Sequence, residues 1–571
     1  MRITCLITLF AAVAVSTTTA ADEPEPSVFD SPVTPPPVTQ IDKLVTTNLA
    51  KLGIQPVLCS DAVFVRRVYL DVIGTLPTAQ EARDFIQDPD LANKRLKLID
   101  RLLDRDEFAD LWAMRWGDVL RIKAEFPVNL WPNAAQAYHR WLHASIASNK
   151  PYDRFARELL TSSGSNFRVG PVNFFRAIQN RKPDGIATAV ALTLMGTRTD
   201  SWPTERLAGM AAFFSQLGYK PTNEWKEEHV FWDPLGSSTT VGNTAPGRPA
   251  IAPPAPPKDR ESPDSPTSPA PPRPHAAIFP DGKMIELPPD RDPREVFADW
   301  LITPKNPWFV RNITNRLWAW LLGRGIIHEP DDIRPDNPPS NPALLAYLEG
   351  DLIASHYDLK HLCRLILNSQ TYQFSSMPRF PSPEAAANFA SYPLRRLDAE
   401  VLIDAINKIT GATDLYTSAI PEPFTYIPEG QPAITLPDGS ITSPFLALFG
   451  RSARATGMVG ERDNKPLPAQ WLYLLNSSNI QRKMEQSANL KTMLDPTRKP
   501  DAIIEDLYLT ILSRFPTPEE VKTIEAYGLV QPAKPAPAGK PPAPPTIIKR
   551  REDWQDIAWS LLNSTEFLYL H

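Results

Sequence analysis

Apolar residues recur along most of the chain at intervals of three and four, which is the spacing of one face of an α-helix. One such stripe in the middle of the chain consists of Phe309, Ile313, Leu317 and Leu321. It is followed by Gly323, a residue type that commonly terminates helices. Alternating apolar and polar positions are rare, and only residues 433–436 suggest a short strand. The pattern therefore predicts an all-α, multi-helix protein.

Helix start signals support this prediction. An N-cap side chain followed three residues later by Glu is the arrangement of a capping box. It occurs three times before a helical run, in the pairs Asp292 with Glu295, Thr78 with Glu81, and Thr517 with Glu520. Helices are therefore predicted to begin at these places.

The two ends of the chain carry similar motifs. Residues 69–81 share Tyr-Leu, Pro-Thr and Glu with residues 508–520, at an offset of 439. Residues 102–108 share Leu-Leu and Glu-Phe with residues 561–567, at an offset of 459. The additional 20 residues match the length of the stretch 531–550. We predict a helical unit used twice, although independent use of the same cap chemistry produces the same pattern.

Proline-rich stretches divide the chain. Prolines number 63 of 571 residues, and residues 246–289 alone hold 15 of them. Such sequences favour extended polyproline II and bury no core, so we expect them to be exposed and protease-sensitive. The predicted units are a leader at 22–40, an N-terminal helical module at 41–235, a Pro-rich linker at 236–290, and a C-terminal helical module at 291–571 with a Pro-rich insertion at 531–550.

Residues 1–21 have the pattern of a secretory signal peptide. Arg2 gives a charged start, residues 3–15 are almost wholly apolar, and small residues precede a cleavage site near Ala20. No other stretch approaches the roughly 20 apolar residues that a membrane span needs. We therefore expect a periplasmic or extracellular protein without a membrane span.

Charge and cysteine content narrow the function classes. With 60 basic and 65 acidic residues the net charge is −5, which predicts no nucleic-acid partner and no polybasic membrane patch. Two cysteines remain after the signal, Cys59 and Cys363. An oxidising compartment permits a disulfide between them, but the apolar helical surroundings of Cys363 favour a buried free thiol.

Catalytic signatures are absent from the sequence: there is no His-Glu-x-x-His, Gly-x-Ser-x-Gly, phosphate-binding glycine loop or Cys-x-x-Cys. His139 and His143 lie four residues apart on a predicted helix, a spacing that can place two imidazoles on one metal ion. Because the pattern offers no third ligand, no metal site is predicted.

The best polar constellation is the loop at residues 331–342, in which four prolines stiffen a segment rich in carboxylates and amides. A stiff, oxygen-rich loop suits a ligand or Ca²⁺, whereas Asn341 before Pro342 also starts a helix. The preceding helix places Asn315 and Arg316 near Trp318, a residue set that can hydrogen-bond and stack on sugars but is also common in cores.

Further motifs occur in a specific order in both modules. The N-terminal motifs are Arg66-Arg67-Val68-Tyr69-Leu70-Asp71, then Trp112, Trp116 and Asp118, then Pro151-Tyr152-Asp153. The C-terminal motifs include Asp292-Pro293-Arg294, Asn315-Arg316-Leu317-Trp318, Arg395-Arg396-Leu397 with Glu400, and Glu461-Arg462. In these motifs the chain resembles a secreted planctomycete-type family that joins a cytochrome-associated N-terminal module to a C-terminal module, both of unknown function. The resemblance implies an association with polysaccharide breakdown and with the cell surface.

Two thiol motifs implied by this resemblance are missing. The N-terminal module of the family often carries Cys-x-x-Cys-His after Gly-x-Arg, but here Gly196-Thr197-Arg198 is followed by Thr199-Asp200-Ser201-Trp202. The C-terminal module often carries Cys-x-Cys before Glu-Arg, but here Met458-Val459-Gly460 stands before Glu461-Arg462. No cofactor is therefore predicted, covalent haem included.

We interpret the chain as a secreted helical binding or scaffold protein of a cell-surface or polysaccharide-handling system, with polysaccharide or a cell-surface protein as its partner. The alternatives are a periplasmic enzyme with a carboxylate or metal site, and a degenerate member of a haem-linked redox family. No catalytic residue is assigned. The candidate binding residues are Asn315, Arg316, Trp318, Asp332, Arg334, Asn337, Asn341, Arg395, Arg396, Glu400, Glu461 and Arg462.

Overall fold

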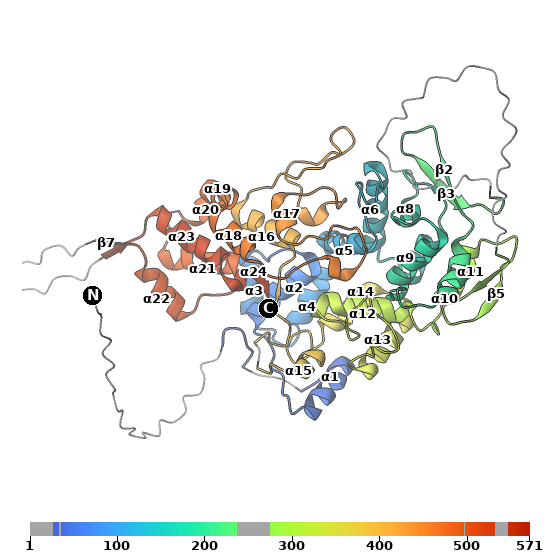
Figure 1. Cartoon of the computed structure of the whole chain (residues 1–571). Helices are drawn as coiled ribbons and strands as arrows, with labels where there is room; N and C mark the ends of the chain where they lie inside the picture. The colour runs from blue at the N-terminus through green and yellow to red at the C-terminus, as the bar shows by residue number, and fades with distance from the viewer. Residues whose placement is uncertain (1–26, 33–35, 237–273, 378, 496, 532–545) are drawn as a thin grey trace, which may run out of the picture.

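The computed structural model describes residues 27–32, 36–236, 274–377, 379–495, 497–531 and 546–571 (Figure 1). The described chain is rich in helices and also contains nine short strands. The predicted all-α class therefore holds approximately. The predicted signal peptide lies outside the described residues.

The helices of the N-terminal half include those predicted from cap signals. Thr78 forms a complete capping box, in which its hydroxyl accepts from the Glu81 N–H and the Glu81 carboxylate accepts from the Thr78 N–H. The helices are α1 Gln40–Lys51, α2 Asp61–Ile73, α3 Ala79–Gln87, α4 Lys94–Leu103, α5 Asp106–Val119, α6 Pro132–Ala147, α7 Tyr152–Thr161, α8 Asn173–Arg176, α9 Pro183–Met195 and α10 Thr204–Ala211. The 3₁₀ turns η1 Gly170–Val172 and η2 Ala212–Phe214 accompany them.

The C-terminal half confirms the other helix boundaries. Asp292 caps the helix that begins at Pro293, Thr517 forms a capping box, and Gly323 ends the helix of the Phe309 stripe with a left-handed φ of 69°. The helices are α11 Pro293–Leu301, α12 Phe309–Leu322, α13 Pro342–Ala354, α14 Leu359–Leu367, α15 Pro383–Ala387, α16 Ala399–Thr410, α17 Pro444–Leu448, α18 Pro468–Asn476, α19 Ser478–Gln486, α20 Ala488–Met493, α21 Pro500–Ile511, α22 Pro518–Ala526, α23 Arg551–Leu562 and α24 Thr565–Leu568. The 3₁₀ turns here are η3 Ala433–Thr435 and η4 Val459–Glu461.

The described residues form four small antiparallel sheets, whose strands are too short for sequence alternation to reveal them. One has the order β1-β3-β2, and the others are pairs: β4-β5, β6-β9 and β7-β8. The strands are β1 Gly164–Ser165, β2 Leu217–Pro221, β3 Glu228–Trp232, β4 Ala276–Ile278, β5 Met284–Glu286, β6 Arg395–Arg396, β7 Leu529–Gln531, β8 Thr546–Ile548 and β9 Tyr569–Leu570.

The strand predicted at residues 433–436 is wrong, because this segment forms η3 instead. The carboxylate of Asp404, on α16, accepts from the N–H groups of Ala433 at 2.8 Å and Ile434 at 3.0 Å. These two hydrogen bonds hold the segment as a turn against α16, and a partner strand is not needed to satisfy its backbone.

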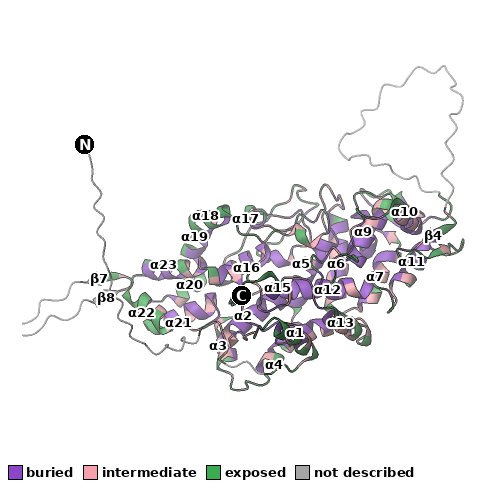
Figure 2. Cartoon of the chain, turned by 60° about the horizontal axis from the view of Figure 1, so that its bottom comes forward, coloured by how far each residue is buried: buried purple, intermediate pink, exposed green. Residues whose placement is uncertain are grey.

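The two halves share one continuous hydrophobic core. Helix α12 packs against α9 of the N-terminal half and against α13 and α14 of its own half. Buried residues line α2, α5 and α12 in the middle of the elongated molecule, whereas α10 and α22 near its two ends show more exposed surface (Figure 2). The halves are therefore packed together over a wide seam.

Part of the predicted Pro-rich linker is folded. The β4-β5 hairpin packs on α10, and Phe279, which follows β4, is 7% exposed and stacks on Phe213 and Trp300. The expectation of exposure is wrong for this segment, because Ala277 and Phe279 supply the apolar surface that the preceding Pro-rich residues lack. Residues 237–273 and 532–545, which were also expected to be exposed, lie outside the described residues.

Two further expectations concern the chain ends and the cysteines. The pair α2-α3 and the pair α21-α22 each consist of a helix followed by a helix that opens with a capping box. The two pairs touch where Arg83 of α3 forms ion pairs with Glu505 and Asp506 of α21. An origin from one duplicated unit stays a prediction.

Cys59 and Cys363 are both buried and free, which confirms the expectation for Cys363.

Among the helices that the structure describes, none combines the length and the hydropathy that crossing a membrane requires.

Candidate functional site

The predicted site residues on α12 lie in the interior. Asn315 is fully buried, and its amide both donates to and accepts from the backbone of Ile327, at 2.9 and 2.8 Å. Trp318 is also fully buried and packs edge-to-face on Phe389. Arg316 donates to the Asp331 carboxylate at 2.9 Å and to the Leu192 carbonyl. These side chains organise the core, and the ligand contact predicted for them stays a prediction.

The loop after α12 satisfies most of its own polar groups. Asp332 pairs with Arg334 at 3.2 Å, and Asn337 donates to the carbonyls of His328 and Asp332. Asn341 caps α13 through the Leu344 N–H. The buried partner of Arg316 is therefore Asp331, which was not among the candidates, and Arg334 is the most exposed of the predicted residues in this loop.

The two segments in which the family resemblance implies cysteines meet at this loop. The Ile333 N–H donates to the Gly196 carbonyl at 2.8 Å, and the Arg198 guanidinium lies 3.6 Å from the Asp332 carboxylate. On the other side the Val459 N–H donates to the Asp331 carboxylate at 2.6 Å. Segments 196–202 and 458–460, far apart in sequence, thus contact residues 331–333 together.

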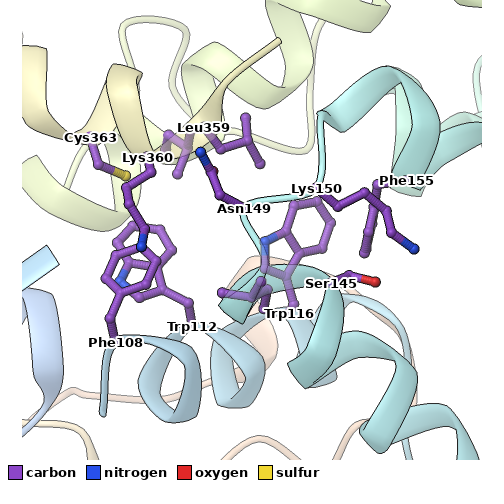
Figure 3. A pocket seen from close by; sticks show the side chains of 12 residues that line it. Phe108, Trp112, Trp116, Ser145, Asn149, Lys150, Phe155, Leu359, Lys360 and Cys363 are labelled. Atoms are coloured by element: carbon purple, nitrogen blue, oxygen red, sulfur yellow. The ribbon is translucent and has the colours of Figure 1, made fainter. Parts of the chain in front are cut away.

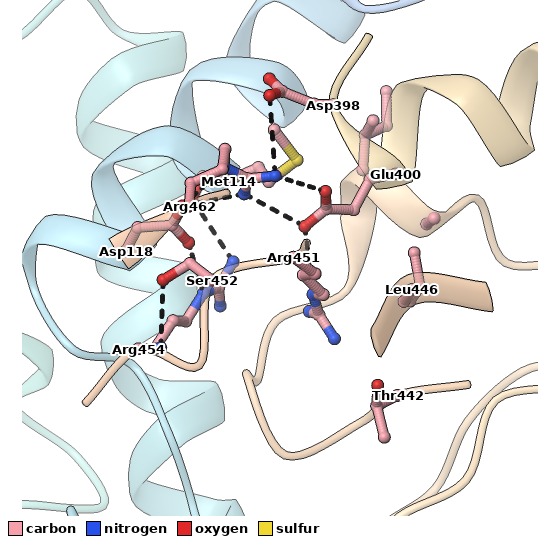
Figure 4. A network of polar contacts seen from close by, with 12 residues as sticks. Met114, Asp118, Asp398, Glu400, Thr442, Leu446, Arg451, Ser452, Arg454 and Arg462 are labelled. Carbon is pink, nitrogen blue, oxygen red and sulfur yellow. Dashed lines mark hydrogen bonds and ion pairs between the residues drawn. The ribbon is translucent and has the colours of Figure 1, made fainter. Parts of the chain in front are cut away.

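A buried ionic network joins the two halves. It consists of Asp118 on α5, Glu400 on α16, and three arginines from the segment between α17 and α18: Arg451, Arg454 and Arg462 (Figure 4). We call these five residues the seam network. Arg462 bridges both carboxylates, at 2.8 Å to Asp118 and 2.6 Å to Glu400. Glu400 and Arg462 are both among the candidate binding residues predicted from the sequence, and the structure places them in direct contact.

Every carboxylate oxygen of the seam network is engaged. Arg454 donates to one oxygen of Asp118 at 2.9 Å, and Arg451 donates to Glu400 at 3.1 Å. Burial raises the pKa of Glu400, but Arg462 and Arg451 outweigh burial and hold this pKa at about 2. A carboxylate that stays ionised and fully bonded suits a structural lock rather than a proton-transfer centre.

The remaining predicted residues also form hydrogen bonds within the protein. Arg395 donates to Asp71 at 2.8 Å, and Asp71 is fully buried beside the hydroxyls of Tyr372 and Tyr392. Arg396 donates to the Phe449 carbonyl at 2.7 Å. The carboxylate of Glu461 accepts from the N–H groups of residues 455 and 456 and so closes a tight loop.

The two histidines that lie four residues apart have different surroundings. Burial lowers the pKa of His139 to about 3, and His143 lies 3.0 Å from Asp110, which raises the pKa of His143. In the part of the chain that the structure describes, no group of three or more His, Cys, Asp or Glu side chains is arranged to hold a metal ion.

A cluster of aromatic side chains with two exposed rings was not predicted from the sequence. It consists of Trp131, Trp225, Lys226 and Phe424, which come from three separate loops, and we call it the aromatic platform. The rings of Trp131 and Phe424 lie 5.2 Å apart, and the Lys226 ammonium lies 5.7 Å from the ring of Trp131 and 5.3 Å from that of Trp225. Trp225 is 70% exposed and Phe424 is 45% exposed. Trp131 and Lys226 are half-buried. Exposed aromatic side chains gathered in one place are typical of interaction sites.

Local backbone geometry presents the platform. The N–H groups of residues 130 and 131 donate to the carbonyls of residues 123 and 124, so the loop folds back on itself. Trp131 and Lys226 have φ values of 72° and 65°, which are strained for residues with a side chain and are often found at functional sites. The carboxylate of Glu125 accepts from the Ala419 N–H at 2.9 Å and ties this loop to the one that carries Phe424.

A family model matches part of each half of the chain. Residues 40–217 match the family PSCyt2, described as a protein of unknown function (DUF1549), and residues 293–528 match PSD1, described as a protein of unknown function (DUF1553). No curated protein and no solved structure gives a significant match.

Proposed function

We propose a function from the surface of the protein, because the chain belongs to the proteins that join a DUF1549 module to a DUF1553 module, two families without an assigned function. In this proposal the protein binds polysaccharide chains. In this proposal it is secreted and acts at the cell surface or in the periplasm, as the signal-like residues 1–21 suggest. The aromatic platform is the observation that carries the proposal.

Its chemistry suits a sugar chain. Flat aromatic faces that are exposed in the free protein pack well against the C–H faces of pyranose rings, and burial of these apolar surfaces drives association. The Lys226 ammonium lies within 6 Å of the centres of two of the rings and can donate hydrogen bonds to hydroxyl or carboxylate oxygens. Phe126, on the same loop as Trp131, is a further apolar side chain and is 80% exposed.

The seam network supports this function by fixing the geometry. Trp131 and Trp225 belong to the N-terminal half and Phe424 to the C-terminal half, so the platform exists only while the halves are held in register. A rigid platform lowers the ordering cost of binding. The protein is thus a scaffold for one binding surface built from both families.

The test compares Trp225→Ala with Trp471→Ala. Trp471, on α18, is exposed and lies outside the platform, which makes it a matched control. Calorimetric titration with xylohexaose, cellohexaose and an alginate oligomer measures binding. If one of these binds the wild type, Trp225→Ala should weaken it by about 30-fold, since a central aromatic contact contributes ~2 kcal/mol or more, and Trp471→Ala should not. Equal binding by both variants, or no binding of any of the three by the wild type, would overturn the proposal.

A further inference from the structure

Two hollows in the described part of the chain differ in size. The smaller one is lined by Trp112, Trp116 and Cys363 among others (Figure 3), and its cavity volume is about 40 Å³. This volume suits ordered water but not an organic ligand. The larger one has a volume of about 680 Å³, which is within the range of small-molecule sites. The larger hollow is therefore the better candidate for a ligand site.

The larger hollow is a cleft between the two halves and is open to solvent. One wall consists of the turn before α3 and the first part of α3, at residues 76–83. The other wall consists of residues on α16, α20 and α21, together with Arg498. We call this hollow the α3–α21 cleft. None of its lining residues belongs to the aromatic platform, so the two surfaces are separate.

The uncharged lining of the α3–α21 cleft is rich in hydrogen-bonding groups. Its hydroxyl and amide side chains include Gln80, Asn489, Thr492 and Thr510. No hydrogen bond within the described residues engages the Thr510 hydroxyl. The apolar lining is aliphatic, from residues such as Leu76, and no aromatic ring lines the cleft. Hydroxyl and amide groups both donate and accept hydrogen bonds, so the lining suits a ligand with many hydroxyl groups better than a flat aromatic one.

Two of the three cations of the cleft are neutralised within the protein. Arg83 and Arg498 both donate to the Asp506 carboxylate, at 3.0 and 2.5 Å. Arg83 also forms an ion pair with Glu505 at 2.9 Å. Two guanidinium groups thus face two carboxylates. Because Arg83 belongs to the N-terminal half, these contacts also hold α3 against α21.

The third cation of the cleft, Lys408 near the end of α16, has no carboxylate partner. Its ammonium donates to the Leu76 carbonyl at 2.5 Å and to a hydroxyl of the same turn at 3.2 Å, and no carboxylate among the described residues forms an ion pair with it. Glu81 and Glu107 attract it from longer range, and both pair with Arg105. An ammonium group has three N–H donors, so one of them remains for a ligand.

We propose that the α3–α21 cleft binds a sugar anion, that is, a small polyhydroxylated molecule that carries a carboxylate or a phosphate. The anionic group is held by the Lys408 ammonium through a charge-assisted hydrogen bond. The hydroxyl groups of the sugar bond to side chains such as Thr510 and Asn489. This site does not depend on the proposed binding of polysaccharide at the aromatic platform.

Because both halves supply its walls, a ligand in the α3–α21 cleft binds only the assembled protein. Linkage then requires that the ligand stabilise the folded chain, with a melting temperature that rises with ligand concentration. The melting temperature is therefore a second readout besides affinity.

The experiment titrates the full chain with galacturonate, galactose 1-phosphate and neutral galactose, and it follows binding by calorimetry and by the melting temperature. We expect at least one of the two anions to bind, and galactose to bind at least about 10-fold more weakly, the order of one hydrogen bond to a charged group. The tighter anion shows whether the site prefers carboxylate or phosphate. The proposal is overturned if neither anion binds at millimolar concentration, or if galactose binds as tightly as the anions.

A charge variant tests the role of the ammonium group. Lys408→Gln keeps a hydrogen-bond donor but removes the charge, and it should weaken binding of the anion by about 10-fold. The matched control is Lys491→Gln, which removes the same charge from α20 at an exposed position that does not line the cleft. The control should bind the anion as the wild type does. Equal binding by Lys408→Gln and the wild type would overturn the proposal.

A third variant tests location and leaves Lys408 in place. Thr492 is exposed and lines the cleft from α20, and Thr492→Phe fills part of the cleft while removing only a hydrogen bond to the Ala488 carbonyl within the same helix. It should abolish binding of the anion. If this variant, with an unchanged circular dichroism spectrum, still binds the anion as the wild type does, the cleft is not the site and the proposal fails.

Discussion

Replacing Glu400 by Gln should test whether the seam network holds the protein together. The substitution keeps the shape of the side chain but removes the charge that faces Arg462 and Arg451. The pKa of Glu400 falls from 4.5 to about 2 in the folded protein, and one pKa unit corresponds to ~1.36 kcal/mol. The ionised Glu400 therefore contributes about 3 kcal/mol to the free energy of unfolding at neutral pH, which agrees with the ~3–5 kcal/mol cost of breaking a buried ion pair.

The dependence on pH follows from the direction of this shift. A carboxyl group whose pKa is depressed by folding stabilises the protein above its unfolded pKa of 4.5, and that contribution is lost as the pH falls toward 2. The difference between the wild type and Glu400→Gln should therefore be about 3 kcal/mol at pH 7, begin to shrink below pH 4.5 and be close to zero near pH 2.

The assay is urea unfolding followed by circular dichroism between pH 7 and pH 3. The control is Glu349→Gln, which removes a half-exposed pair with Arg311 and should cost at most ~1 kcal/mol because solvent screens it. A loss below 1 kcal/mol in Glu400→Gln at pH 7, or a loss that does not shrink in acid, would refute the assignment of the seam network as a structural lock.

Three further predictions concern pH, proteolysis and cofactor content. Because burial lowers the pKa of His139 from 6.5 to about 3, stability should fall as the pH drops from 6.5 toward 3, and His139→Phe should flatten this dependence of the melting temperature. Trypsin should cut after Lys258 and Arg260 in the Pro-rich linker before it cuts after the buried Arg294; mass spectrometry showing the reverse order would contradict this. Denatured protein should show no Soret band, since the sequence has no Cys-x-x-Cys-His.

The starts of single helices can be predicted from the sequence, whereas contacts between residues far apart in the chain cannot. The helix starts at Thr78, Asp292 and Thr517 depend on neighbours within three residues, so their patterns predict them directly. Asp118 was seen only as part of a motif, because its partner Arg462 lies 344 residues away along the chain. Trp225 gave no periodic signal, since exposed loop residues follow neither helical nor strand spacing.

The shared contact of segments 196–202 and 458–460 with residues 331–333 bears on the two cysteine motifs that the family resemblance implies. If each of the cysteine motifs implied by the family resemblance supplied ligands at this one place, they acted as a single unit, although they belong to two different modules. If one of the two cysteine motifs were lost, the other motif would no longer hold the bound group. Selection would then relax on both motifs together. The paired absence of the two motifs is then one event rather than two. Cysteines introduced in only one module would then supply only half of such a ligand set.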